Sequence, residues 1–315
     1  MTTTRDSVLQ FGVYLPNVAW VTPPPPEELA TYAIEAEQGG FDSVWVEDRL
    51  LHSEIEMLEA ITTLTFVAAR TSKISLGTSV LLLNLRNPLS LAKSLSTLDY
   101  LSNGRLIIGA SLGGRLFEYA AAGVSMRTRV TRFNNAIQFL RTAWGEEQPS
   151  RPDLLTVPML PRPVQRHIPM WLGGRVEAAL GRAGIIGDGW LASSTTTPEA
   201  FRKGWETVSA HAAAAGRDPA QLMPAKFCYI HVDDSTERAL SRLETTLPKY
   251  YGAPYDAANL AIYGPPERCI EQATRFLDAG VRTLIFATVT PDRAQLERVA
   301  QEILPALRVR GALLK

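Results

Sequence analysis

Short apolar segments alternate with longer segments of helical periodicity along nearly the whole chain. Eight segments have the length and composition of buried strands, at residues 8–15, 43–46, 74–80, 105–111, 168–172, 189–192, within 221–232, and at 282–289. Segments with helical spacing follow them, at residues 27–38, 58–70, 90–101, 131–144, 176–183, 198–215, 235–247, 265–279 and 293–307. This alternation predicts a parallel sheet, and eight strand–helix units predict that the sheet closes into a (β/α)8 TIM barrel.

Two segments depart from the alternation. Residues 146–166 carry five prolines without clear periodicity, and residues 250–263 are aromatic and resemble a loop. The alternation resumes after both, so neither predicts a domain linker. A barrel needs about 250 residues plus insertions. We therefore expect residues 1–315 to form a single barrel domain with short insertions.

Composition narrows the possible partners. The 32 basic and 32 acidic residues cancel, so no basic excess predicts binding to nucleic acid or anionic lipid. Two cysteines without close spacing exclude a disulfide framework, and four scattered histidines give no metal signature. The polar N-terminus and the short apolar runs predict neither a signal peptide nor a membrane span. We expect a cytoplasmic protein with a small-molecule substrate.

Candidate chemistry follows the second strand. In a TIM barrel the working residues lie just beyond the C-terminal ends of the strands. Here Glu47 and Asp48 could act as acid or base, although Arg49 could neutralise one of them as a structural pair. His52 comes shortly after, and a lone histidine is more often a surface residue than a base.

Glycine-rich turns follow the fourth and fifth strands. The turn at residues 109–114 allows the backbone to approach a flat ligand closely. The Gly173-Gly174 turn precedes a helix, and backbone N–H groups at a helix start bind phosphate, to which Arg175 could add charge. Hydroxyl donors at residues 193–197 follow the next strand. The absence of G-x-G-x-x-G and of a P-loop argues against a Rossmann or nucleoside triphosphate site.

The turn at residues 109–114 also matches the G-x-S-x-G pattern of a hydrolase nucleophile elbow, with Ser111 as the nucleophile. An elbow requires a helix directly after the turn, and an aspartate and a histidine later in the chain. A loop is predicted here instead. The hydrolase hypothesis therefore ranks behind a ligand-binding turn.

The order of the motifs resembles a known family. They are GFDSVWV at residues 40–46 with Asp48, LGTSV at 76–80, NP at 87–88, LSNGR at 101–105, the turn at 109–114, RPVQ at 162–165, PMWLGG at 169–174 and GDGW at 187–190. Over about residues 11–307 the chain resembles the bacterial luciferase-like flavin and deazaflavin oxidoreductases.

The resemblance implies a cofactor and its place. Members bind coenzyme F420 or FMN in the barrel mouth, with the phosphate near the turn at residues 173–174. Many have a non-prolyl cis peptide bond after the third strand, which here would join Ser79 and Val80, and many form homodimers through helices two and three. The cofactor-binding residues so implied are Asp48, Thr78, Ser79, Val80, Ser111, Gly113, Gly173, Gly174, Arg175, Val176 and Ser193.

The chain departs from the deazaflavin dehydrogenases at their acid and base positions. They often have Asp-His after strand two, where this chain has Asp48-Arg49, and a glutamate in the glycine-rich turn, where it has Gly114. The candidate catalytic residues are Asp48, Glu118 and His52. Aromatic side chains favour an apolar or aromatic pocket: Trp20, Phe117, Tyr250, Tyr251 and Tyr255.

The preferred hypothesis is an oxidoreductase that uses coenzyme F420 for hydride transfer to or from an apolar organic substrate. The first alternative is an FMN-dependent monooxygenase, which would take reduced flavin from a separate reductase and activate oxygen. The second is a non-catalytic flavin-binding protein.

Overall fold

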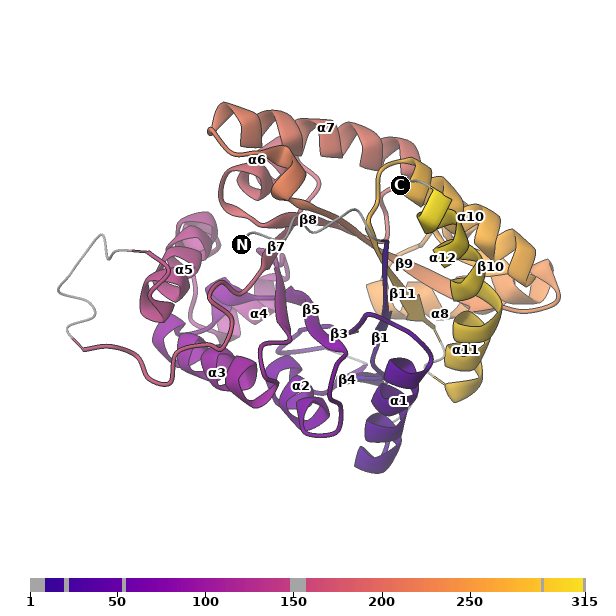
Figure 1. Ribbon diagram of the computed structural model, residues 1–315, viewed down its shortest axis with the longest axis horizontal. Helices are drawn as coiled ribbons and strands as arrows, with labels where there is room; N and C mark the ends of the chain where they lie inside the picture. Colours follow the sequence, from indigo (N-terminus) through magenta and orange to yellow (C-terminus); the bar gives the residue numbers. More distant parts are fainter. Residues whose placement is uncertain (1–8, 20–22, 53–54, 148–156, 290–291, 314–315) are drawn as a thin grey trace.

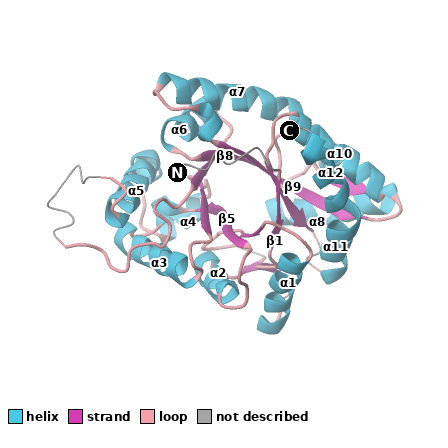
Figure 2. Ribbon diagram, viewed as in Figure 1, coloured by secondary structure: helices cyan, strands magenta, loops and turns pink. Residues whose placement is uncertain are grey.

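Eight parallel strands form a closed barrel in a computed structural model (Figure 1), which describes residues 9–19, 23–52, 55–147, 157–289 and 292–313. In barrel order the strands are β1 (Gln10–Tyr14), β3 (Ser43–Val46), β5 (Ser75–Leu81), β6 (Leu106–Ala110), β7 (Met170–Gly173), β8 (Gly189–Ala192), β9 (Met223–Val232) and β11 (Thr283–Thr288). Pairing of β9 with both β8 and β11, and of β11 with β1, closes the ring (Figure 2). The predicted TIM barrel is confirmed.

Helices surround the barrel (Figure 1). The principal helices are α1 (Pro26–Gln38), α2 (Ala60–Ala68), α3 (Pro88–Leu101), α5 (Arg129–Trp144), α6 (Glu177–Ile186), α7 (Pro198–Ala214), α8 (Thr236–Tyr251) and α10 (Pro266–Asp278). Shorter helices are α4 (Leu116–Ala121) and α9 (Ala257–Leu260). The last predicted helix is divided into α11 (Arg293–Arg298), a π-helical turn (Val299–Ile303) and α12 (Leu304–Leu313). In the described part of the chain, no helix is long and apolar enough to cross a bilayer.

The segment predicted as a loop at residues 250–263 contains regular structure. It includes the end of α8, all of α9 and the start of β10 (Ile262–Gly264). β9 is ten residues long, and β8 pairs with its first part, residues 223–226. The far end of β9 would otherwise be an open edge, and β10 pairs with residues 230–232 there. A strand of three residues has too little sequence pattern to be recognised.

Trp45 fills the inside of the barrel. Its side chain is fully buried and packs on Trp171, with ring centroids 5.3 Å apart. A Cβ at Gly12 or Gly77, on the strands that flank β3, would lie 2.4 and 2.2 Å from atoms of Trp45. These glycines therefore make room for the indole, and the packed interior leaves the barrel mouth as the place for a ligand.

A β-bulge ends β5 at the barrel mouth. Gly77 and Thr78 pair with Ile107 and Ile108 of β6, but Leu81 pairs with Ala110, so β5 contains one extra residue. The peptide bond between Ser79 and Val80 lies in this bulge and is cis, as predicted. The bulge turns the backbone of residues 79–80 toward the mouth.

Candidate functional site

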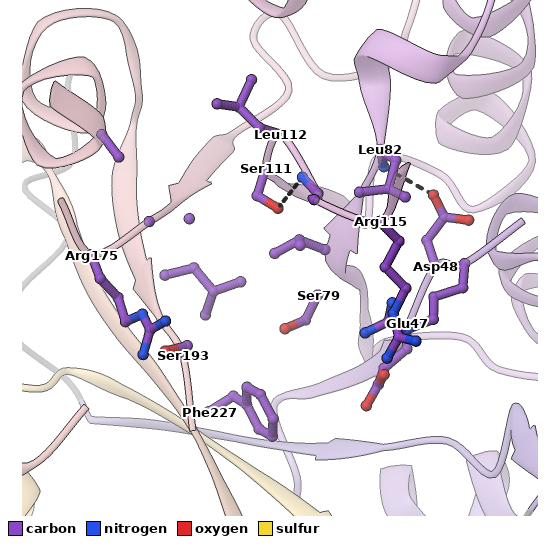
Figure 3. Close-up of a pocket in the computed structure, with 18 of the residues that line it drawn as sticks. Glu47, Asp48, Ser79, Leu82, Ser111, Leu112, Arg115, Arg175, Ser193 and Phe227 are labelled. Carbon is purple, nitrogen blue, oxygen red and sulfur yellow. Dashed lines mark hydrogen bonds between the residues drawn. The ribbon is translucent and has the colours of Figure 1, made fainter. Parts of the chain in front are cut away.

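A cavity of about 510 Å³ occupies the barrel mouth (Figure 3), which is within the usual size range of small-molecule sites. Its wall comes from the ends of β3, β5, β6, β7 and β8, from Phe227 of β9, and from the end of α8. Eleven of the residues predicted from the sequence line it: Asp48, Ser79, Val80, Ser111, Gly113, Glu118, Gly173, Gly174, Arg175, Val176 and Ser193.

The other two predicted cofactor-binding or catalytic residues, Thr78 and His52, lie elsewhere. Thr78 is fully buried, and its hydroxyl donates to the Gly109 carbonyl at 2.8 Å, so it ties β5 to β6 beneath the cavity. His52 is not among the described residues of the cavity wall. Its Nδ1 accepts from the Ile55 N–H at 3.1 Å, and its ring stacks on Tyr250.

The glycine-rich turns bring the backbone to the cavity surface. A Cβ at Gly173 would lie 3.3 Å from the Ser111 Cβ and 3.6 Å from Val80 Cγ1. The turn after β6, the bulge of β5 and the turn after β7 therefore converge at one place. Gly113 has φ +65°, and a Cβ there would lie 2.8 Å from Leu82. A side chain at Gly173 would crowd the space that a flat ligand needs.

The start of α6 is open toward the cavity. Its N-cap is Val176, which has no side-chain oxygen, so no side chain caps the first N–H groups of this helix. Arg175 lies at the same turn and donates to the Thr195 hydroxyl at 2.8 Å. Uncapped N–H groups beside a guanidinium and hydroxyls are suited to an anion such as a phosphate.

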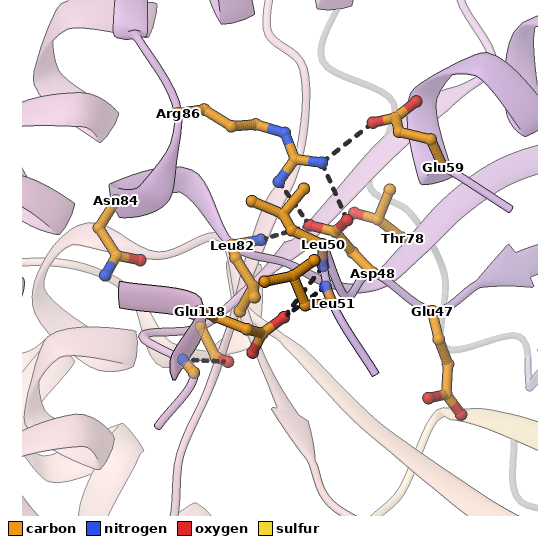
Figure 4. A network of polar contacts seen from close by, with 12 residues as sticks. Glu47, Asp48, Leu50, Leu51, Glu59, Thr78, Leu82, Asn84, Arg86 and Glu118 are labelled. Carbon is orange, nitrogen blue, oxygen red and sulfur yellow. Dashed lines mark hydrogen bonds and ion pairs between the residues drawn. The ribbon is translucent and has the colours of Figure 1, made fainter. Parts of the chain in front are cut away.

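Asp48 is engaged by an arginine (Figure 4). Its carboxylate accepts from two nitrogens of Arg86, at 2.7 and 2.9 Å, and from the Leu82 N–H at 2.9 Å. Arg86 also donates to Glu59 at 3.0 Å. Of the two carboxylates that Arg49 could neutralise, Asp48 is not its partner: Arg49 donates to the Tyr250 hydroxyl at 3.4 Å, and its charge acts on Glu47.

Glu118 binds the backbone of the loop after β3. It is buried, and its Oε1 accepts from the Leu50 N–H at 2.9 Å and the Leu51 N–H at 3.4 Å. The carboxylates of Asp48 and Glu118 thus both bind protein groups. Proton transfer by Asp48, Glu118 or His52 stays a prediction.

Glu47 is a wall residue that the list of candidate catalytic residues does not include. Its carboxylate accepts a hydrogen bond from the Tyr250 hydroxyl. Burial raises its pKa to about 6, against the opposing effects of the Tyr250 hydrogen bond and the charge of Arg49. Strand alternation could have favoured Glu47 over Asp48 as the acid or base, since Glu47 is two residues after the inward-facing Trp45.

Aromatic residues line one side of the cavity, as expected. Phe227, Tyr250 and Tyr251 are on the wall, and Tyr255 stacks behind Tyr251 at 5.2 Å. Phe117 is half-exposed and is not among the described wall residues. Trp20 lies outside the described residues.

The hydrolase hypothesis finds no support in the geometry. The Ser111 hydroxyl accepts from the Gly113 N–H at 3.4 Å, and the described residues of the cavity wall include no histidine that could activate it. His167 binds Glu146 and Asp188, and His211 binds Glu177. The described residues also contain no cluster suited to a metal ion.

Comparison with known proteins identifies the family. The family model of luciferase-like monooxygenases matches residues 9–283. The chain belongs to this family. The similarity to luciferase-like oxidoreductases inferred from the motifs is therefore confirmed.

Relatives of named activity align with most of the chain. The F420-dependent glucose-6-phosphate dehydrogenase of Amycolatopsis mediterranei is 29% identical, over 91% of this chain and 96% of the relative. The 5,10-methylenetetrahydromethanopterin reductase of Methanolobus tindarius is 29% identical, over 71% of this chain and 68% of the relative.

Solved structures of other proteins share the fold. An F420-dependent secondary alcohol dehydrogenase, solved with an F420–acetone adduct, has a TM-score of 0.81 and 21% identity, covering 95% of this chain and 99% of its own. A monooxygenase from Streptomyces bottropensis has a TM-score of 0.79 and 21% identity, covering 95% of this chain and 100% of its own.

Proposed function

We propose that the protein is an oxidoreductase that uses coenzyme F420 for hydride transfer to or from an apolar organic substrate. The observation that carries the proposal is the convergence at one cavity of the β5 bulge, the turn after β7 and the uncapped start of α6. Relatives named as F420-dependent dehydrogenases, aligned over nine tenths of the chain, support this cofactor over others.

The residues present fit such a cofactor. Ser79, Val80 and Ser111, together with Gly173, would contact its ring, because a Cβ at Gly173 would fill that space. Gly174, Val176 and Ser193 would hold its phosphate together with Arg175, through backbone N–H, hydroxyl and guanidinium groups. When bound, the deazaflavin supplies the site that accepts or donates a hydride.

The rim of the cavity supports an apolar substrate. Leu50 and Leu51 are exposed on the loop after β3, and Leu116 at the start of α4 is 70% exposed. Leu112 lies on the cavity wall. Exposed leucines next to a cavity offer an apolar surface that a small organic molecule would cover on binding.

Cofactor titration tests the proposal. Purified protein is titrated with F420 and, separately, with FMN, and binding is followed by the fluorescence of each. We expect F420 to bind at micromolar or lower concentration, and Arg175→Ala to weaken binding about 10-fold, as for one lost charged hydrogen bond. Arg202→Ala, on the exposed face of α7, is the matched control and leaves the affinity unchanged. Absence of F420 binding would refute the proposal.

FMN-dependent oxygenation is the second candidate, because the family description names monooxygenases. In that case the protein would accept reduced FMN from a separate reductase. Tight FMN binding without F420 binding in the same titration favours this alternative, and a consumption assay with reduced FMN and oxygen then tests it.

We also propose a homodimer formed through α2 and α3. Three large apolar side chains of α3 are more than half exposed: Leu89, Tyr100 and Leu101. Such a surface on one helix is typical of an interface. Light scattering of the wild type and of Leu101→Glu tests it. A dimer that the substitution converts to monomer supports the interface, and a wild-type monomer contradicts it.

A further inference from the structure

We propose that Glu47 is a catalytic residue that takes the substrate proton during oxidation and returns it during reduction, assisted by the Tyr250 hydroxyl bonded to its carboxylate. The inference rests on the oxidoreductase function proposed above. It assigns the proton to Glu47, a residue on the cavity wall that the sequence offers beside Asp48 as an acid or base and that the family resemblance does not include.

The backbone places Glu47 in the barrel mouth. Glu47 follows β3 directly, on the same side of the strand as Trp45, so its side chain stands above the packed barrel interior. The buried amide of Asn17 fixes this position: its Nδ2 donates to the Glu47 carbonyl at 2.9 Å, and its Oδ1 accepts from the Glu47 N–H at 3.1 Å. The main chain is held by Asn17, which leaves the side chain for the cavity.

The carboxylate of Glu47 differs from its two neighbours on the wall. Asp48 is bound by a guanidinium and a backbone N–H, and Glu118 is bound by two backbone N–H groups. Figure 4 shows the Glu47 side chain directed away from this network. Among the described residues, Tyr250 is the one that donates to the Glu47 carboxylate. Of the three wall carboxylates, Glu47 is therefore the one not engaged by a guanidinium or a backbone N–H.

The groups around the Glu47 carboxylate determine its protonation state. Groups facing it are Arg49 after the same strand, Tyr250 and Tyr251 of α8, Tyr14 of β1 and Tyr229 of β9. Burial raises the pKa of Glu47 to about 6, so both protonation states are accessible near neutral pH. Burial, and next the nearby Glu47 charge, raise the pKa of Tyr250 well above its ordinary value, so Tyr250 remains a donor.

The proton step balances with hydride transfer. In oxidation of an alcohol, the C–H bond breaks and the hydride leaves with its electron pair to the oxidised deazaflavin. The O–H bond breaks, its proton goes to the Glu47 carboxylate, and the C=O bond forms. The substrate is oxidised by two electrons and the cofactor is reduced by two. Reduction of a ketone reverses each change, and the proton comes from Glu47.

The first experiment needs neither cofactor nor substrate. Protein labelled with ¹³C at glutamate carboxyls is titrated from pH 4 to 9 by NMR, and the Glu47 resonance is identified by its loss in Glu47→Gln. We expect it to titrate near pH 6, and at higher pH in Tyr250→Phe, because the Tyr250 hydrogen bond lowers this pKa. A resonance that titrates at the ordinary glutamate value overturns the proposal.

The second experiment measures turnover. F420 reduction is followed with a panel of secondary alcohols and glucose 6-phosphate for the wild type, Glu47→Gln and the exposed control Glu56→Gln. We expect Glu47→Gln to bind F420 within about 2-fold of the wild type while kcat falls about 100-fold. The wild-type rate should rise with pH through about 6 and the residual rate of the variant should not.

The outcomes separate the two proposals. If the wild type does not bind F420, the cofactor assignment is refuted. The NMR titration still tests the pKa of Glu47 in that case. Normal F420 binding with kcat of Glu47→Gln within about 3-fold of the wild type overturns the catalytic role and leaves the cofactor assignment intact. Where no compound of the panel is oxidised, the titration decides.

Discussion

The carboxylate of Asp48 and the guanidinium of Arg86 form a two-point ion pair, with N–O distances of 2.7 and 2.9 Å, at the edge of the cavity. The Asp48 side chain is fully buried and that of Arg86 is 13% exposed. This pair joins the loop after β3 to the segment after β5. It therefore fixes the relative position of two sides of the candidate site.

Removal of Asp48 should destabilise the protein strongly. Asp48→Ala leaves the Arg86 charge and the Leu82 N–H without a buried acceptor, so we expect the free energy of unfolding to fall by about 3 kcal/mol in urea titrations. Arg275→Ala removes a comparable ion pair with Glu271 that is about two thirds exposed, and should cost about 0.5 kcal/mol or less. Similar losses for both substitutions would contradict this role of Asp48.

The barrel interior should not tolerate a methyl group at Gly77. The new Cβ would lie 2.2 Å from Trp45, and we expect Gly77→Ala to lower the free energy of unfolding by about 3 kcal/mol. Gly114→Ala, whose Cβ would meet no atom within 4 Å, should change it by less than about 0.5 kcal/mol.

A double-mutant cycle tests the assignment to Trp45. Trp45→Leu alone leaves a cavity beside Gly77. In this background Gly77→Ala should lower the free energy of unfolding much less than in the wild type, because the added methyl group has space. Additive losses would show that the Gly77 substitution acts through another neighbour.

The barrel and most of the cavity wall could be predicted from the sequence, because both depend on local patterns of residues. The strand–helix alternation predicts the eight barrel strands, and the turns at 109–114 and 173–174 are recognisable as glycine sequences at strand ends. The cis peptide bond at residues 79–80 was expected from the family resemblance alone. The side chains at these two positions do not by themselves predict a cis bond.

The roles of adjacent carboxylates depend on distant partners. Glu47 and Asp48 look equivalent in the sequence, but Asp48 binds Arg86, 38 residues later, and Glu47 binds Tyr250, 203 residues later. The alternation of side chains along a strand predicts that Glu47 and Asp48 point in different directions. Which residues they bind follows only from the tertiary structure. The same holds for β10, which forms because β9 extends beyond β8.

His167 should stabilise the protein in a pH-dependent way. Hydrogen bonds to Asp188 and Glu146 raise its pKa to about 9, so its contribution is complete below the ordinary value near 6.5 and is lost as the pH rises through 9. We expect His167→Gln to lower Tm by a few degrees at pH 6 and by less at pH 10. The side chain is 46% exposed, so solvent limits the effect.

A matched histidine provides the control for this experiment. His211 pairs with Glu177, whose side chain is 74% exposed, and His211→Gln should change Tm little at either pH. A Tm difference for His167→Gln that is the same at pH 6 and pH 10 would contradict a charged contribution of His167.

Glu47 should reduce the stability of the protein at the pH at which its carboxylate is ionised and can accept a proton. Its pKa is near 6 in the folded protein, above the value of about 4.3 in an unfolded chain, so between these values the unfolded chain loses the proton first. The free energy of unfolding therefore falls as pH rises through this window, by at most about 2 kcal/mol, and stays lower above it.

The isosteric substitution Glu47→Gln removes this ionisation. We expect it to raise the free energy of unfolding by up to about 2 kcal/mol at pH 7.5 and to have little effect at pH 4, measured by urea titration across the pH range. The same substitution at the exposed Glu56, Glu56→Gln, is measured alongside as the control for replacing a glutamate. Parallel pH curves for the wild type and Glu47→Gln would exclude a raised pKa. A carboxylate that lowers stability at neutral pH, while kcat depends on it, is placed for chemistry rather than for folding.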